Sequence, residues 1–328
     1  MAAALALDMA DRPPTSAWGH TFDLEWDVET LAAGTIEIAR HNQLDFVKLQ
    51  VRATCFAETF GAAYEYSGSP ATEPVLLRPG ATTLGDWRRI AEGAHDPGPL
   101  EDQVQVLSRV AQALSPEVPV IQTVFSPGMV AWFLTGRDIG LLDRLLREEP
   151  DLMAAGLSRI GELLARFTID SVAAGAAGVF YAINPLADVR MISTDGYSRT
   201  YLPSDLEAIA PAESGWFNML HLCGPRINRD LIARLPMSCV NWSTHDDGNP
   251  SLTEVRDQLH VAVAGGLHRH SLIEVKEPGG ILAAAARALA ETGGRGHLLT
   301  PGCSVSPWAG ARDPNLEAMR RAALNLTA

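Results

Sequence analysis

Two short segments of the chain combine histidine and cysteine in a pattern that suits a metal ion. His221 and Cys223 lie in MLHLCG and Cys303 lies in LLTPGCS, and each segment directly follows an apolar, strand-like run. In an extended strand, residues i and i+2 point to the same side, so His221 and Cys223 can converge on one point. Two thiolates and one imidazole form a borderline-soft ligand set that suits Zn²⁺. Three protein ligands also leave a fourth position for a substrate.

Each of these residues also has an ordinary structural interpretation. Cysteine is often buried as a small hydrophobic residue, and a histidine at a strand end is often hydrogen-bonded within the core. About 80 residues separate Cys223 from Cys303, which is not the spacing of a short zinc motif. Spacing alone therefore leaves both interpretations open. The remaining cysteines, Cys55 and Cys239, have no partner pattern, and we expect them to be packing residues.

The elements that must position these residues alternate between short apolar runs and longer helical patterns. We expect seven strands, at Asp45–Val51, Val118–Phe125, Gly178–Ile183, Phe217–Leu222, Cys239–Trp242, Leu272–Val275 and His297–Thr300. We expect helices at Glu101–Leu114, Ile139–Glu148, Asp151–Ala174, Ser204–Ile209, Leu252–Val263 and Ile281–Glu291. This alternation is typical of βα units around a parallel sheet, and an eighth strand would close a barrel. In a barrel, His221, Cys223 and Cys303 would all emerge at the C-terminal mouth, where barrel enzymes hold their sites.

The domain organisation follows from what is absent between these elements. The chain has no internal repeat and no long Pro/Ser-rich linker, so we expect one domain over residues 21–328 after a flexible tail over residues 1–20. The apolar start of this tail lacks a basic leader, and Asp8 and Asp11 interrupt it. The Gly/Pro/Thr-rich segment Ser67–Pro99 is expected to be an insertion or a lid above one mouth of the barrel. Ser204 with Glu207 and Ser251 with Glu254 fit the capping-box pattern for helix starts.

The composition excludes several classes of protein. The 328 residues are 47% hydrophobic and carry a net charge of −13 with only four cysteines. An acidic chain without a Lys/Arg-rich run is not expected to bind nucleic acid or anionic membranes. No stretch suits a membrane span. Four cysteines are too few to staple a chain of this length, so we expect a reduced, cytoplasmic setting.

Longer strings around the cysteines resemble a known family. HLCG and LLTPGCSVSP are similar to the His-x-Cys and late Gly-Cys elements of the uroporphyrinogen decarboxylase-like superfamily, above all its zinc-dependent methyltransferase branch, the methylcobalamin:coenzyme M methyltransferase-like enzymes. DFVKLQVRATCFAETFG, VIQTVFSPGMVAWFLTG and LPSDLEAI match other blocks more loosely, and the similarity extends from about Thr21 to the end.

The resemblance implies an α/β fold with a single (β/α)8 TIM barrel and a zinc ion held by His221, Cys223 and Cys303. It also implies that the metal activates a thiol acceptor for methyl or alkyl transfer. The methyl donor in this branch is a corrinoid on a separate protein, and this chain has no evident cobalamin-binding domain of its own. The resemblance permits a homodimer. The fourth ligand stays open, with Asp188, Asp246 and Glu274 as candidates.

The sequence departs from the true decarboxylases in ways that change the expected substrate. It lacks their N-terminal arginine-rich motif, and an ungapped reading from Asp45 places Arg52 where they carry a key aspartate. Their late Gly-His-Gly motif appears as Gly302-Cys303-Ser304. We therefore do not expect uroporphyrinogen to be the substrate.

Several residues are candidates for substrate binding. Arg52 and Lys48, on or just after the first strand, can bind a carboxylate, sulfonate or phosphate, and Arg52 is favoured because its planar guanidinium matches such anions; its alternative is an ion pair with Glu58. Tyr181 and Asn184 end a middle strand and are candidates to line the pocket, although Tyr181 is explained equally well as a barrel residue with its hydroxyl at the rim. His245 follows another strand and is expected at the same mouth.

Two further histidine positions are weighed against the site. His20, in a Trp-Gly-His element, can project into the mouth from the leading segment, but structural packing is favoured. His268 and His270 are expected before a strand, on the wrong face of the barrel.

Three functions remain open at this stage. The leading one is a zinc-dependent methyl or alkyl transferase with a thiol acceptor. The second is a carboxy-lyase that acts on a non-porphyrin carboxylated substrate, held by Arg52. The third is a non-catalytic barrel that binds a small molecule or a corrinoid protein.

Overall fold

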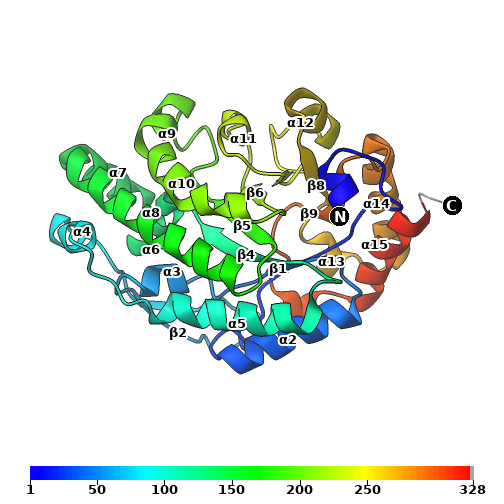
Figure 1. Cartoon of the computed structure of the whole chain (residues 1–328), viewed down its shortest axis with the longest axis horizontal. Helices are drawn as coiled ribbons and strands as arrows, with labels where there is room; N and C mark the ends of the chain where they lie inside the picture. The colour runs from blue at the N-terminus through cyan, green and yellow to red at the C-terminus, as the bar shows by residue number, and fades with distance from the viewer. Residues whose placement is uncertain (326–328) are drawn as a thin grey trace.

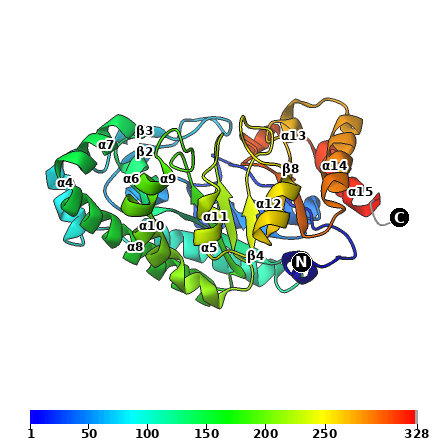
Figure 2. The same ribbon diagram turned by 90° about the horizontal axis from the view of Figure 1, so that it is seen from above.

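The computed structural model of the chain describes residues 1–325, which fold around one parallel sheet of seven strands in the order β1-β4-β5-β6-β7-β8-β9. These strands are β1 (Val47–Leu49), β4 (Val120–Phe125), β5 (Gly178–Ile183), β6 (Met219–Leu222), β7 (Cys239–Asn241), β8 (Ala262–Leu267) and β9 (His297–Pro301). Helices surround the sheet, as Figures 1 and 2 show. No helix within the described residues is long and apolar enough to cross a membrane.

The segment around Thr15, which precedes the helix at Val28–His41, closes the sheet between β9 and β1. Thr15 forms a parallel bridge with Leu299 of β9, and the backbone N–H of Asp45, just before β1, donates to the Thr15 carbonyl at 2.9 Å. The Ser16 hydroxyl donates to the Phe46 carbonyl at 2.7 Å. This short segment therefore takes the eighth strand position, and the fold is an α/β barrel.

The same segment corrects the expectation of a flexible tail through residue 20. Residues 15–18 are at most 3% exposed, and Arg12 forms an ion pair with Asp45. The tail was misjudged because Thr-Ser-Ala-Trp lacks the β-branched run that marks a strand, while its pairing with β9 depends on residues far away in the sequence.

The helices cover the outer surface of the barrel. They are α1 (Ala2–Leu5), α2 (Val28–His41), α3 (Cys55–Glu58), α4 (Leu84–Ala91), α5 (Gly98–Leu114), α6 (Pro127–Leu134), α7 (Ile139–Glu148), α8 (Pro150–Ala173), α9 (Thr194–Thr200), α10 (Leu202–Ile209), α11 (Asp230–Arg234), α12 (Leu252–Leu259), α13 (Ser271–Glu274), α14 (Pro278–Thr292) and α15 (Asp313–Asn325), with 3₁₀ turns η1 (Ala210–Ser214) and η2 (Trp308–Gly310). Val47 and Leu49 of β1 belong to one buried cluster with Leu31 of α2 and Leu107 of α5. Alternate strand residues thus pack outward against the helices and leave the others to the barrel interior.

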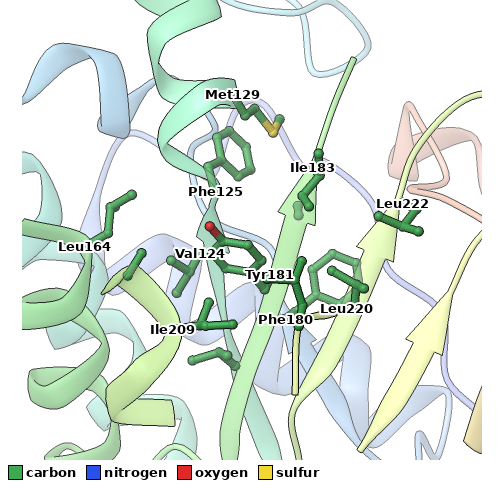
Figure 3. Packing of buried hydrophobic residues seen from close by; sticks show 14 of the residues in the cluster. Val124, Phe125, Met129, Leu164, Phe180, Tyr181, Ile183, Ile209, Leu220 and Leu222 are labelled. Atoms are coloured by element: carbon green, nitrogen blue, oxygen red, sulfur yellow. The ribbon is translucent and has the colours of Figure 1, made fainter. Parts of the chain in front are cut away.

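Figure 3 shows this alternation at β5, where the rings of Phe180 and Tyr181 lie on opposite sides of the strand. The Tyr181 hydroxyl donates to Asp205 of α10 at 2.6 Å, whereas Phe180 lines the interior cavity. Whether a strand residue reaches the site therefore depends on which of the two alternating sides of the strand it occupies.

A small antiparallel hairpin lies outside the barrel sheet. It consists of β2 (Ala63–Glu65) and β3 (Val75–Arg78). In Figure 2 it lies beside α6 and α7, and Arg137, between those helices, forms an ion pair with Glu73 of the hairpin turn. Glu73 and Pro74 line the central cavity, so part of the expected insertion Ser67–Pro99 does cover the mouth.

The expected elements need two corrections near the C-terminus. The run Leu272–Val275 is not a strand, because residues 271–274 form α13, and the strand is instead β8 at Ala262–Leu267, which overlaps the end of the expected helix Leu252–Val263. Short apolar runs do not separate helix from strand by periodicity alone. In consequence His268 and His270 follow β8 and lie at the mouth that holds the site, contrary to the expectation.

The two expected helix caps have different outcomes. Ser251 caps α12 by accepting a hydrogen bond from the backbone of Glu254, which is one half of the predicted capping box; the Glu254 carboxylate instead accepts from Arg229. Ser204 lies inside α10, which begins at Leu202, and its hydroxyl donates to the Tyr201 carbonyl. Pro203 explains the earlier start, since proline is favoured in the first turn of a helix.

Candidate metal centre

His221, Cys223 and Cys303 come together at the C-terminal mouth of the barrel. One ligand atom from each lies within 4.8 Å of the others, and no other such group of three occurs within residues 1–325. The sulfur of Cys303 lies 3.6 Å from the sulfur of Cys223 and 3.6 Å from Nε2 of His221. The convergence expected from the i, i+2 spacing on β6 and from the end of β9 is therefore present.

The imidazole of His221 is held by a neighbouring carboxamide. Nδ1 of His221 lies 2.7 Å from Oδ1 of Asn241. The amide nitrogen of Asn241 donates to the Ala264 carbonyl at 3.0 Å and to the Pro301 carbonyl at 3.2 Å, so its oxygen must face the histidine. His221 therefore carries a proton on Nδ1, which would leave the lone pair of Nε2 for a metal ion held together with the two cysteines, the arrangement typical of metal-ligating histidines.

The donor set fits zinc in chemistry and in spacing. Zinc binds sulfur at ~2.3 Å and imidazole nitrogen at ~2.0 Å in tetrahedral sites, so two sulfur ligands are separated by roughly 3.8 Å and a sulfur and a nitrogen by roughly 3.5 Å. Both observed separations of 3.6 Å agree with these values. His221, Cys223 and Cys303 are thus the residues that would hold the ion.

A close approach of two loops places Cys303 in this cluster. A Cβ on Gly302 would lie 2.4 Å from the Cα of Ser243, in the loop after β7. Only glycine permits this approach of the two backbones. The glycine before Cys303 is thus a steric requirement, because any side chain at position 302 would push the Cys303 loop away from the loop that carries Ser243.

The two thiols differ in acidity. The hydrogen bond from Cys223 lowers the pKa of Cys303 well below its ordinary value, and His221 and Arg269 lower it further, although burial opposes them. The same hydrogen bond, together with burial, raises the pKa of Cys223. Of the two thiols, Cys303 is therefore the one that loses its proton more readily.

The cluster lines a cavity of about 320 Å³. Aromatic and apolar side chains form one wall, namely Phe22, Phe125, Met129, Trp132, Phe133 and Phe180. Polar and charged side chains form the rest, with Lys48, Gln50, His20 and Glu25 on the β1 side and Arg269 and His270 on the β8 side. A largely apolar cavity with a few convergent polar groups is typical of a small-molecule site.

The expected substrate-binding residues separate by strand parity. Asn184 lines the cavity, together with Phe180 and Ala182 of the same face. Tyr181 does not line it, because its position on β5 turns the ring outward. Its hydroxyl and that of Tyr197 both donate to Asp205 at 2.6 Å, and burial raises the pKa of this carboxyl to about 7. Tyr181 is therefore a core residue in this fold.

Arg52 is likewise placed away from the cavity. Its guanidinium donates to both carboxylate oxygens of Glu58, at 3.1 and 2.7 Å, and stacks on Trp26 with its central carbon 5.0 Å from the ring centroid. The side chains of Arg52 and Glu58 are only 10% and 16% exposed. The ion-pair alternative from the sequence thus describes Arg52 better than anion binding does.

His245 and the candidate fourth ligands do not join the cluster. His245 packs against His268, with ring centroids 5.6 Å apart, and is not part of the cavity lining within the described residues. Asp188 is paired with Arg190, and Asp246 accepts a hydrogen bond from Ser243. Glu274 lies on α13, outside the group of three ligands.

Two features of the site were missed by sequence reasoning. Arg269 lies beside the thiols: burial lowers its pKa, but the neighbouring charge of Cys303 more than offsets this and raises the pKa overall. It was overlooked because β8 was misplaced. His20 lines the cavity and contacts Glu25 at 2.8 Å, whereas packing was the favoured expectation and projection into the mouth its alternative. Its signal was the Trp-Gly-His element in a segment that was judged to be tail.

Comparison with known proteins agrees with the fold. No match was found among the curated proteins. Among solved structures, a methyltransferase from Methanosarcina mazei is 20% identical over 99% of this chain and 97% of its own, with a TM-score of 0.78. A B12-independent methionine synthase from Shewanella sp. W3-18-1 is 11% identical over 94% and 96%, with a TM-score of 0.60. A putative vitamin-B12-independent methionine synthase from Listeria monocytogenes is 15% identical over 92% and 86%, with a TM-score of 0.55.

At these identities the solved structures establish the fold alone. The sequence model of the uroporphyrinogen decarboxylase (URO-D) family, in contrast, matches residues 15–323, nearly the whole chain, including the segment that closes the barrel and all three residues of the cluster. The chain therefore belongs to the uroporphyrinogen decarboxylase (URO-D) family.

Proposed function

We propose that this protein is a zinc-dependent methyl or alkyl transferase that activates a thiol acceptor at His221, Cys223 and Cys303. The observation that carries the proposal is the convergence of these three ligand atoms at the mouth of a cavity large enough for a small substrate. The printed descriptions of the structural relatives, a methyltransferase and methionine synthases, support the same class of reaction.

Different residues of the chain have different roles in such a site. Asn241 orients His221 so that the lone pair of Nε2 faces the thiols. The two cysteine ligands, both deprotonated when they hold a metal, balance the charge of a divalent ion. Zinc, when bound, would supply the Lewis acidity that favours the thiolate form of a substrate thiol. The aromatic wall formed by Phe125, Trp132 and Phe180 limits water around the acceptor sulfur.

The methyl donor in this proposal is the corrinoid on a separate protein that the family resemblance implies. The described residues support the acceptor half of the reaction more directly, since the ligand cluster and its cavity are both formed by this chain. The carboxy-lyase alternative loses its main support, because Arg52 is neutralised by Glu58 and does not line the cavity.

Metal analysis tests the proposal. Protein purified without chelator is expected to hold about one zinc ion per chain, and Cys223→Ala and Cys303→Ala are each expected to lose it. Cys239→Ala is the matched control, because Cys239 is fully buried in β7 and is not part of the cluster. The zinc-loaded protein should also transfer a methyl group from methylcobalamin to a thiol. Metal-free protein that releases CO₂ from a carboxylated substrate would instead establish the carboxy-lyase.

A further inference from the structure

A buried lysine without an ion pair lies on the wall of the same cavity. Lys48 is 5% exposed, and its ammonium nitrogen lies 2.6 Å from Oε1 of Gln50 and 4.9 Å from the centroid of the Phe180 ring. Within residues 1–325 it forms no ion pair with a carboxylate. A buried lysine is normally paired, because an ammonium loses much hydration free energy when it leaves water.

Strand parity explains why this lysine faces inward. Val47 and Leu49, its neighbours on β1, pack outward against α2 and α5, so Lys48 and Gln50 point into the barrel. The alternation of side chains along β1 thus places the ammonium in the cavity wall. It cannot turn to solvent without reversing the strand.

A chain of hydrogen bonds with a single direction holds the ammonium in place. Because Oε1 of Gln50 accepts from Lys48, its amide nitrogen must donate, and it lies 2.9 Å from Nε2 of His20. His20 then carries its proton on Nδ1, which lies 2.8 Å from Oε1 of Glu25. Glu25, whose side chain is 1% exposed, also accepts from the backbone N–H of Thr21 at 3.0 Å. Each group thus donates in the direction of Glu25, from Lys48 through Gln50 and His20.

The chain leaves the lysine with capacity for a ligand. An ammonium has three N–H donors; one is used by Gln50 and the ring of Phe180 offers only a diffuse contact. The carboxylate of Glu25, whose charge acts on Lys48, is already engaged by His20 and Thr21. Burial lowers the pKa of Lys48 to about 7, although the neighbouring charges of Cys303 and Glu25 oppose this shift. An anion placed beside it would be stabilised by a charge-assisted hydrogen bond.

We propose that Lys48 is a specificity-determining residue that binds an oxyanion of the substrate, and that Glu25 positions it through His20 and Gln50. The inference assigns a chemical class to the molecule that occupies the cavity, and it rests on the proposed function only for the reaction that follows binding. Arg52, the residue favoured by the sequence for this role, forms an ion pair with Glu58, whereas Lys48 forms no ion pair with a carboxylate within residues 1–325.

Matched acid and amide probes isolate the charge of the ligand. Binding of 3-mercaptopropionate and 3-mercaptopropionamide is measured by ligand-observed NMR titration at pH 7. These probes have nearly the same size and share the thiol, so the ratio of their dissociation constants reports on the oxyanion. We expect the wild-type protein to bind the acid about ten-fold more tightly than the amide. Lys48→Met, which keeps the length and removes the charge, should bring the ratio close to one.

The controls separate this residue from its neighbours and from the metal. Arg269→Gln should keep a clear preference for the acid, because Arg269 lies on the β8 side beside the thiols. Glu25→Gln should reduce the preference only in part. Lys48→Gln replaces Lys48→Met if circular dichroism shows that the latter is unfolded. Zinc content should be unchanged in both lysine variants.

The pair butyrate and butyramide, which lacks a thiol, makes the test independent of the metal. Preference for butyrate in a protein that proves to contain no zinc would sustain the role of Lys48 and reject the transferase. Equal binding of acid and amide by the wild-type protein would overturn the inference. So would a preference that survives loss of the Lys48 charge or that disappears in Arg269→Gln.

Discussion

Oδ1 of Asn241 lies 2.7 Å from Nδ1 of His221, and this contact decides which ring nitrogen faces the thiols. Asn241 lies on β7 and His221 on the adjacent β6, where the two residues are paired in the parallel register. The carboxamide is completely buried, and its nitrogen is held by carbonyl groups on β8 and β9. Three neighbouring strands thus cooperate to orient one imidazole.

Asn241→Leu is expected to weaken zinc binding by about 10–100-fold, because His221 would lose the acceptor that holds its tautomer and orientation. Competition with a chromogenic chelator measures the affinity. Asn218→Leu is the matched control: Asn218 is also buried and hydrogen-bonded, but it contacts Val179 and Ala212 at the opposite end of β6. Equal losses of zinc affinity in the two variants would mean that Asn241 acts through stability alone.

Arg52→Ala is expected to destabilise the protein by about 3 kcal/mol without changing the zinc content or the preference for acid over amide probes. The variant would leave the carboxylate of Glu58 poorly exposed to solvent and without its partner. Urea denaturation followed by circular dichroism measures the free energy of unfolding. Arg52→Ala combined with Glu58→Gln should lose less than the sum of the two single changes. Unaltered stability together with a lost preference for acid over amide probes would mean that Arg52 binds the substrate.

His297 is expected to make stability depend on pH in the acidic range. It begins β9 and is fully buried. Its Nε2 donates to the Gly265 carbonyl of β8, and its Nδ1 accepts from Thr292 at the end of α14. Burial lowers the pKa of His297 to about 4. In the unfolded state the histidine binds its proton near pH 6.5, whereas the folded state keeps it neutral down to about pH 4. The stabilisation that depends on neutral His297 is therefore complete above pH 6.5 and is lost as the pH falls towards 4. We expect His297 to account for about 3 kcal/mol of this loss.

The measurement compares unfolding of the wild-type protein and of His297→Gln between pH 4.5 and 7.5, and the difference between the two proteins should shrink as the pH falls. The comparison is needed because Asp205 acts in the opposite direction. Burial raises its pKa to about 7, so its neutral form favours the folded state at low pH and this contribution is lost as the pH rises through 7. A difference that is independent of pH would contradict the assignment to His297.

Local sequence patterns predicted most of the barrel but not its boundaries. The helix α7 and the strand β5 have the expected ranges, and α5 and α8 lie within three residues of theirs, because periodicity over many residues is a strong signal. The closing segment at residues 14–17 and the strand β8 were missed. The first is made of small and polar residues and the second mostly of alanine and glycine, and the extended form of both is stabilised by pairing with distant strands, which no local pattern encodes.

By itself, the sequence indicated a candidate metal site. The i, i+2 spacing places His221 and Cys223 on one side of a strand, and the family resemblance added Cys303 at the end of another; the fold brings the three side chains together. Only the tertiary structure decided which charged groups face the cavity. Arg52 and Lys48 are four residues apart, and the sequence favoured Arg52 as the anion ligand with an ion pair to Glu58 as its alternative. The fold forms that ion pair, whereas Lys48 faces the cavity and has no ion pair with a carboxylate within residues 1–325. A charge is available to a ligand only when folding leaves it without such a partner, and contacts in the folded chain decide which candidate pair forms.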